Sequence, residues 1–125
     1  MKIWTALAMT LLYAGHSEAH HAEAVFDHSQ TSSVIGTVKE FLWANPHTLI
    51  YLEVPGISGK SDVLAFEGGS AGIMRRNGWS RRSVKVGDKL TIEFHPRRDK
   101  KPGGMLITAT LTDGTKLGWQ PATTP

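Results

Sequence analysis

From Thr48 to Val54 the chain shows the strict alternation of side chains between two faces that is typical of a strand. One face carries Thr48, Ile50, Leu52 and Val54, and the other carries His47, Leu49, Tyr51 and Glu53. A period of two is the spacing at which side chains return to the same side of a strand. The segment therefore predicts a strand that is buried on one face only.

The segment before it, residues 34–43, predicts a long strand that changes face. Its apolar alternation is interrupted by a three-residue step between Val38 and Phe41. One extra residue in a strand reverses which side chains face the core, so we expect a bulge or sharp coil near Lys39–Glu40. A strand that serves two sheet faces in this way is typical of a small closed barrel.

Further strands and one short helix complete the predicted domain. The strands are expected at residues 62–67, 89–95, 105–111 and 116–119, and the helix at residues 71–76. Ser70 has the hydroxyl to cap the helix, and Gly78 tolerates the left-handed conformation that ends it. Apolar residues without clean alternation predict a strand at 62–67 that is covered on both sides.

This element order predicts an all-β fold with one short helix. Three strands, a helix and two strands is the order of the oligonucleotide/oligosaccharide-binding (OB) barrel, so we expect a five- to six-stranded OB-like barrel over residues 34–119. An arm at residues 20–33 would precede it, a tail at residues 120–125 would follow, and alternation would place Met105 and Ile107 on one face. A six-stranded sandwich without the helix is the alternative.

Residues 1–19 predict a secretory signal peptide. Lys2 provides a positive start, residues 3–14 an apolar stretch, and Ser17–Ala19 a small-x-small cleavage site. Because a membrane span needs about 18–20 apolar residues, we expect no transmembrane span after processing, and an uncleaved anchor is the less favoured alternative. The short leader favours a bacterial periplasmic protein. The sequence has no cysteine, which excludes disulfides and thiolate metal sites.

Charge is distributed unevenly between the two halves of the chain. Residues 20–67 carry two basic and six acidic residues, a net charge of −4, whereas residues 75–101 carry ten basic and three acidic residues, a net charge of +7. The second half therefore favours anionic partners, although charges of this kind also simply solvate loops. Export argues against nucleic acid and favours an acidic glycan or an anionic lipid surface.

Several short motifs carry a resemblance to a known family. They are Gly36-Thr37-Val38, Trp43, Asn45-Pro46-His47, Glu67-Gly68-Gly69-Ser70, Arg75-Arg76-x-Gly78-Trp79 and Gly87-Asp88, together with His20-His21 at the predicted mature start. The chain resembles a family of small exported bacterial proteins of unknown function. It departs from that family's pattern in the Ala-Glu-Ala that follows the histidines. The resemblance implies export but no assigned activity.

Histidines provide the sharpest chemical hypothesis. If the signal peptidase cuts after Ala19, the free amino group and the imidazole of His20 form a chelating pair suited to copper(II), which His21, His28, His47 or His95 could complete. Without thiolates, copper(I) is less favoured. The competing interpretation is that His20 and His21 form a flexible tail and that His47 and His95 are ordinary surface residues.

Two other clusters are candidate ligand sites. Asn45–Pro46 predicts a corner that places His47 beside Trp43, and alternation puts Tyr51 and Glu53 on the face of His47. Glu53 could orient the imidazole, the aromatic rings could stack on a sugar or base, or the group could be a packed corner. The second cluster is basic and is expected on the ligand-bearing side of the barrel; it comprises Arg75, Arg76, Arg81, Arg82, Arg97, Arg98, Lys100 and Lys101.

Enzymatic motifs are missing from the sequence. There is no nucleophile elbow, no HExxH, no phosphate loop and no cysteine, so a copper oxygenase using His20 is the one enzymatic alternative. The sequence thus predicts an exported, non-catalytic binding protein that holds copper or another divalent transition metal through histidines. The alternative is an envelope-interaction module that binds an anionic glycan or lipid through its basic surface.

Overall fold

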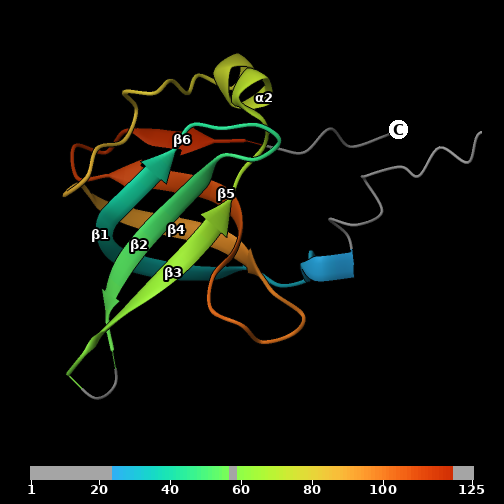
Figure 1. The fold of residues 1–125 in the computed structure, drawn as a ribbon, viewed down its shortest axis with the longest axis vertical. Helices are drawn as coiled ribbons and strands as arrows, with labels where there is room; N and C mark the ends of the chain where they lie inside the picture. Colours follow the sequence, from blue (N-terminus) through green and yellow to red (C-terminus); the bar gives the residue numbers. More distant parts are fainter. Residues whose placement is uncertain (1–23, 57–58, 120–125) are drawn as a thin grey trace, which may run out of the picture.

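Within the part of the chain that the structure describes, the elements with defined bounds are six strands and the short helix α2. The computed structural model describes residues 24–56 and 59–119 (Figure 1). The elements in order are β1 (Ser32–Leu42), β2 (Leu49–Pro55), β3 (Ser61–Glu67), α2 (Ala71–Arg76), β4 (Lys89–Pro96), β5 (Gly104–Leu111) and β6 (Lys116–Gly118). Among these residues, no helix is long and apolar enough to cross a membrane.

The strands form one sheet that closes on itself. Their order is β3-β2-β1-β4-β5-β6, and a parallel pairing of β3 with β5 joins the two sides into a five-stranded barrel with β6 as an extra strand. The closure consists of Phe66 opposite Gly104 and Glu67 opposite Met105. The predicted OB-like barrel is confirmed. The sandwich alternative is wrong, because the strands form one closed sheet and not two sheets packed face to face.

Strand β1 coils around the barrel and pairs with two neighbours. Its first part pairs with β4 and its last part with β2, and the register with β2 shifts between Val38 and Glu40. The predicted bulge is therefore confirmed at its predicted place. At Gly36, a Cβ atom would lie 2.6 Å from the carbonyl oxygen of Glu53 and 2.7 Å from Cγ of Leu52. Only glycine lets β1 approach β2 this closely.

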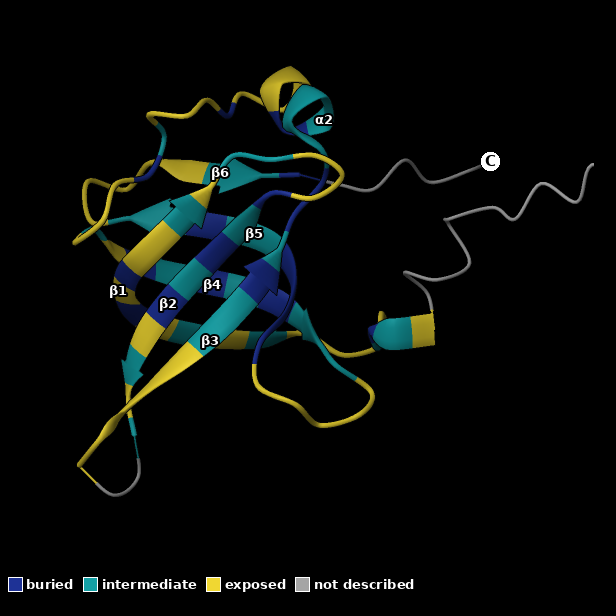
Figure 2. Cartoon of the chain, in the orientation of Figure 1, coloured by how far each residue is buried: buried dark blue, intermediate teal, exposed yellow. Residues whose placement is uncertain are grey.

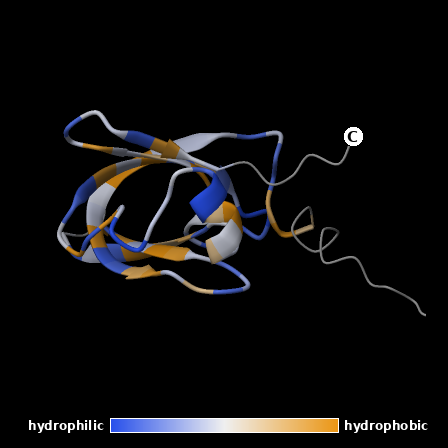
Figure 3. Ribbon diagram, turned by 90° about the horizontal axis from the view of Figure 1, so that it is seen from above, coloured by the Kyte–Doolittle hydropathy of each residue, from blue (hydrophilic) through white to orange (hydrophobic). Residues whose placement is uncertain are grey.

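The barrel interior is filled by inward-facing apolar side chains. Viewed from the α2 end, hydrophobic and hydrophilic positions alternate around the ring of strands (Figure 3). Figure 2 shows the buried positions along the strands and the exposed ones on the β2–β3 hairpin and the β4–β5 loop. The fully buried side chains include Ile50, Leu52, Phe66, Met74, Leu90 and Ile92.

Helix α2 lies at one end of the barrel and begins and ends as the sequence predicts. The side-chain oxygen of Ser70 accepts a hydrogen bond from the backbone N–H of Ile73 at 3.3 Å, and Gly78 has a φ of 88°. Met74 is the buried residue of the helix. Trp79, just beyond it, is buried and donates its indole N–H to the carbonyl oxygen of Gly118 at 3.0 Å.

Two expectations about strand faces are wrong. Strand β3 is not covered on both sides, because Val63 on its outer face is 43% exposed. Along β5, Met105 and Leu106 are both buried and the alternation is broken, because the register with β4 shifts between Glu93 and Phe94. The bulge lies on β5, where two residues occupy the space of one.

The segment before β1 docks on the barrel through Phe26. This residue is 3% exposed and forms an isolated antiparallel bridge with Arg97. Strand β1 starts at Ser32, inside the predicted arm at residues 20–33. The predicted signal peptide, His20, His21 and the predicted tail lie outside the described residues.

Candidate functional site

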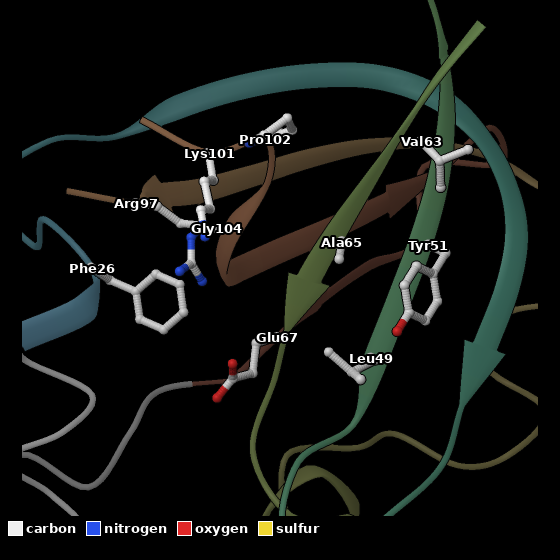
Figure 4. Close-up of a pocket in the computed structure, with 10 residues that line it drawn as sticks. All are labelled: Phe26, Leu49, Tyr51, Val63, Ala65, Glu67, Arg97, Lys101, Pro102 and Gly104. Atoms are coloured by element: carbon white, nitrogen blue, oxygen red, sulfur yellow. The ribbon is translucent and has the colours of Figure 1, made fainter. Parts of the chain in front are cut away.

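A groove runs along the outer face of β2 and β3. Its volume is about 570 Å³, within the about 300–1,000 Å³ of small-molecule sites. Its lining comprises Phe26, Leu49, Tyr51, Val63, Ala65, Glu67, Arg97, Lys101, Pro102 and Gly104 (Figure 4). The two strands provide one wall, and the arm with the β4–β5 loop provides the other.

Strand periodicity explains which side chains reach this groove. Leu49, Tyr51 and Glu53 alternate with the buried Ile50 and Leu52, so they face outward. Antiparallel pairing places Leu49 opposite Glu67 and Tyr51 opposite Ala65. Side chains of directly opposed residues lie on the same face of a sheet, so β2 and β3 present one continuous, largely apolar wall.

Backbone hydrogen bonds hold the opposite wall in place. The N–H of Asp27 donates to the carbonyl oxygen of Pro96 at 2.8 Å, and the N–H of Arg98 donates to the carbonyl oxygen of Val25 at 2.9 Å. These bonds flank the Phe26 bridge. The guanidinium carbon of Arg97 lies 5.9 Å from the centroid of the Phe26 ring, a cation–π distance. A charged group and an aromatic ring thus line the groove side by side.

The guanidinium of Arg97 is oriented by Asp99. Its Nε and Nη2 donate to the two carboxylate oxygens at 3.0 and 2.8 Å, which leaves Nη1 outside this pair. The hydrogen bonds from Arg97 and the backbone N–H of Lys101 lower the pKa of Asp99 to about 2. The pKa of Arg97 is raised, first by its hydrogen bond to Asp99 and then by the negative charges of Asp99 and Glu67.

His47 contacts the acidic end of the groove. Its Nδ1 lies 3.1 Å from Oε1 of Glu67 and 3.3 Å from the carbonyl oxygen of Gly68. Because both oxygens are acceptors, Nδ1 carries the proton in the neutral ring and Nε2 keeps its lone pair. The expected partner Glu53 lies instead beside Thr37 in another depression.

A second histidine cluster lies next to the arm. The rings of His28 and His95 have centroids 4.9 Å apart, and Nδ1 of His95 lies 2.7 Å from the carbonyl oxygen of Gln30. By the same argument, Nδ1 of His95 donates and its Nε2 is free to accept. A fixed N–H partner of this kind is typical of metal-binding histidines.

The predicted site residues are thus distributed over separate places. Tyr51 and Arg97 line the groove, whereas Trp43 and Arg75 line a different depression near α2. Arg76 and Arg98 are exposed and line neither. Within residues 24–56 and 59–119, no three His, Asp or Glu side chains come together as a metal site. The predicted ligands His20 and His21 lie outside those ranges.

Sequence reasoning did not assign Phe26 or Glu67 to a ligand site, and it did not place Lys101 beside them. Phe26 belongs to the predicted arm, Glu67 to the end of a predicted strand, and Lys101 to the predicted basic cluster. Glu67 follows the buried Phe66 and therefore lies on the outer face of β3, but the uneven apolar pattern of residues 62–67 did not indicate this. Phe26 and Lys101 reach the groove through tertiary contacts that no local pattern encodes.

Comparison with known proteins identifies a family but no activity. A family model described as a family of unknown function (DUF6152) matches residues 9–108. No curated protein matches the chain, and no solved structure does. The motifs of the resemblance and the predicted export stay predictions.

Proposed function

The chain belongs to this family of unknown function, and from its groove we propose that it is an exported, non-catalytic protein that binds an acidic glycan. The observation that carries the proposal is the mixed lining of the groove. Tyr51 and Phe26 offer apolar ring surface, Arg97 and Lys101 offer positive charge, and Glu67 offers acceptor oxygens.

The position of the groove supports a polymeric ligand. OB barrels bind oligonucleotides and oligosaccharides on the face of their second and third strands, between flanking loops. The groove lies on that face, with the β4–β5 loop at its side. Export makes a glycan the more accessible of the two polymers.

Apolar and polar groups in the groove match the two surfaces of a sugar ring. The C–H face of a sugar packs on an aromatic ring such as Tyr51, while its hydroxyl groups need hydrogen-bond partners. Glu67, paired with His47, accepts such bonds. A carboxylate on the sugar would lie at the opposite wall, where Nη1 of Arg97 and the ammonium of Lys101 are available.

Calorimetric titration with oligogalacturonate, beside a neutral maltooligosaccharide, tests this proposal. We expect the acidic oligomer to bind more tightly, and we expect Arg97→Gln and Tyr51→Ala each to weaken binding about tenfold or more. The matched control is Arg98→Gln, which removes the same charge from the adjacent residue outside the groove. Equal affinity for all variants, or no binding by the unaltered protein, would overturn the proposal.

Metal binding is the second candidate function, favoured by the His28–His95 pair. Two imidazoles on one metal, with nitrogen ligands at about 2.0–2.1 Å, have ring centroids about 4.5–5.2 Å apart. The separation of 4.9 Å lies in this interval. The amino group and imidazole of His20, together with His21, would complete a nitrogen-rich copper site after processing.

Copper titration of protein that begins at His20 tests this second candidate. His95→Gln should weaken copper binding, and an additional alanine before His20 should weaken it as well, because the amine would no longer chelate with the imidazole. His47→Gln is the control from the other histidine cluster, and it should leave copper affinity unchanged. Equal copper affinity in the unaltered, His95→Gln and extended proteins would reject the site.

Export itself is proposed from residues 1–19. The mature protein should appear in the periplasmic fraction, and its amino-terminal sequence should begin at His20. Recovery of the intact chain from the cytoplasm alone would contradict both the export and the copper chelate.

A further inference from the structure

A second depression lies at the α2 end of the barrel. Its volume is about 250 Å³, and its lining comprises Trp43, Arg75, Ser80, Arg81 and Arg82. It shares no lining residue with the groove. Trp43 comes from the loop between β1 and β2, which lies close to α2 (Figure 1). The depression is smaller than the about 300–1,000 Å³ of sites for drug-sized ligands, so it suits a single compact group.

The lining of this depression carries an uncompensated positive charge. Three of its residues are arginines, and none forms an ion pair with any carboxylate of the described residues. The surrounding segment, residues 68–87, contains five basic residues and no Asp or Glu. Three arginines that line one depression add their positive charges there, which favours a multiply charged anion.

Local contacts hold the arginine-bearing segments in place. The guanidinium carbon of Arg75 lies 5.9 Å from the centroid of the Trp43 ring, a cation–π contact. Asn45 Oδ1, two residues beyond Trp43, accepts the backbone N–H of Ala71 at 3.0 Å and ties this loop to the first residue of α2. These contacts hold α2, which carries Arg75, against the loop that carries Trp43.

The turn after α2 is held by its own serines. The side-chain oxygen of Ser83 accepts the N–H of Ser80 at 2.8 Å, and that of Ser80 accepts the N–H of Arg82 at 3.1 Å. In the second bond the Ser80 oxygen is an acceptor, so its own hydroxyl proton is left to donate to a ligand. Arg81 and Arg82 flank this donor in the same lining.

We propose that this depression binds a phosphate group. Guanidinium groups bind phosphate oxygens through paired, charge-assisted hydrogen bonds, and a hydroxyl donor suits the remaining oxygen. Three positive charges exceed what one carboxylate neutralises, which favours a phosphate over the uronic acid proposed for the groove. The phosphate is either free in solution or the headgroup of an anionic phospholipid, and both present the same oxygens.

The experiment measures the Nε1–H NMR signal of Trp43 during titration with inorganic phosphate. A second arm measures co-sedimentation with phosphatidic acid vesicles and with phosphatidylcholine vesicles. We expect a saturable change at Trp43 with inorganic phosphate, or co-sedimentation with phosphatidic acid vesicles but not with phosphatidylcholine vesicles. Binding in the first arm identifies free phosphate, and binding in the second arm alone identifies a lipid headgroup.

Two neighbouring arginines provide a matched pair of variants. Arg75→Gln should weaken phosphate binding about tenfold or more, whereas Arg76→Gln, which removes the same charge from the same helical turn outside the depression, should leave it within about twofold. Arg81→Gln should follow Arg75→Gln. Thermal unfolding confirms that each variant is folded. Equal effects of Arg75→Gln and Arg76→Gln, or no binding in either arm, would overturn the proposal.

Discussion

Phe26 and Arg97 meet where the arm crosses the end of β4. Their backbones form an antiparallel bridge, and the guanidinium of Arg97 lies over the Phe26 ring. One wall of the groove thus depends on a segment that precedes the first barrel strand. Stability of the arm and affinity for a groove ligand are therefore coupled.

Phe26→Ala should reduce both stability and ligand affinity. Removing a buried phenylalanine ring costs about 3 kcal/mol or more in free energy of unfolding, and here it also removes groove surface. Urea denaturation measures the first effect, and oligogalacturonate titration measures the second. His28→Ala, at an exposed position of the same arm, is the control and should unfold at nearly the unaltered urea concentration. An unchanged midpoint for Phe26→Ala would show that the arm contributes no stability.

Asp99 should titrate well below an ordinary aspartate. Hydrogen bonds from Arg97 and from the N–H of Lys101 lower its pKa from 3.8 to about 2. A lowered folded-state pKa means that the ionised form stabilises the fold. This contribution is fully present above about pH 3.8 and is lost as pH falls through about 2.

NMR titration of the Asp99 carboxyl carbon measures this pKa directly. In Arg97→Gln the pKa should rise toward 3.8, because the largest cause of its depression is gone while the Lys101 backbone bond persists. Arg98→Gln removes the neighbouring charge and should have a smaller effect. An unaltered protein in which Asp99 titrates near 3.8 would contradict the bidentate pair.

Glycine-to-alanine substitution should have opposite effects at two positions. Gly36→Ala would force a Cβ atom against Leu52 and the Glu53 carbonyl, and overpacking of this kind costs about 1–3 kcal/mol. At Gly72 in α2 the nearest atom is 3.9 Å away, so alanine should stabilise the helix by about 0.5–1 kcal/mol. Chemical denaturation of both variants is the measurement. A stable Gly36→Ala protein would contradict the close approach of β1 and β2.

Trp79→Phe isolates the hydrogen bond between the indole N–H and Gly118. Phenylalanine keeps an aromatic ring in the core but leaves the carbonyl oxygen without this donor, which should cost about 1–3 kcal/mol. Trp43→Phe is the comparison, because the indole N–H of Trp43 takes part in no hydrogen bond among the described residues. Thermal unfolding should therefore show a larger decrease for Trp79→Phe. Equal decreases would argue that ring size rather than hydrogen bonding matters at position 79.

The elements that sequence could predict are those specified by local chemistry. The cap at Ser70, the left-handed residue at Gly78 and the face change near Lys39 each follow from a few adjacent residues, and together they give the element order of the barrel. The exposure of Val63 was not predictable in this way. A run of apolar residues reads the same whether its outer face is covered or lines an open groove.

The candidate site was only partly predictable because it depends on register between distant strands. Tyr51 and Arg97 were recognised from residue type, but their common groove results from closure of β3 onto β5. His47 and Glu67 are separated by the β2–β3 hairpin in the chain, and no short-range pattern pairs them. Alternation along β2 suggested Glu53 instead, since it lies on the same strand face.

The junction between β3 and β5 has only two residue pairs, so the strands of the barrel are not paired equally all around. Seven residue pairs join β2 to β3, but only Phe66 with Gly104 and Glu67 with Met105 join β3 to β5. Amide hydrogens at this seam should exchange with deuterium sooner than those between β2 and β3, because fewer bonds must break to expose them. Glu67 and Gly104 also line the groove, so a ligand bound there would contact both strands. Such a ligand should slow hydrogen exchange at the amides between β3 and β5.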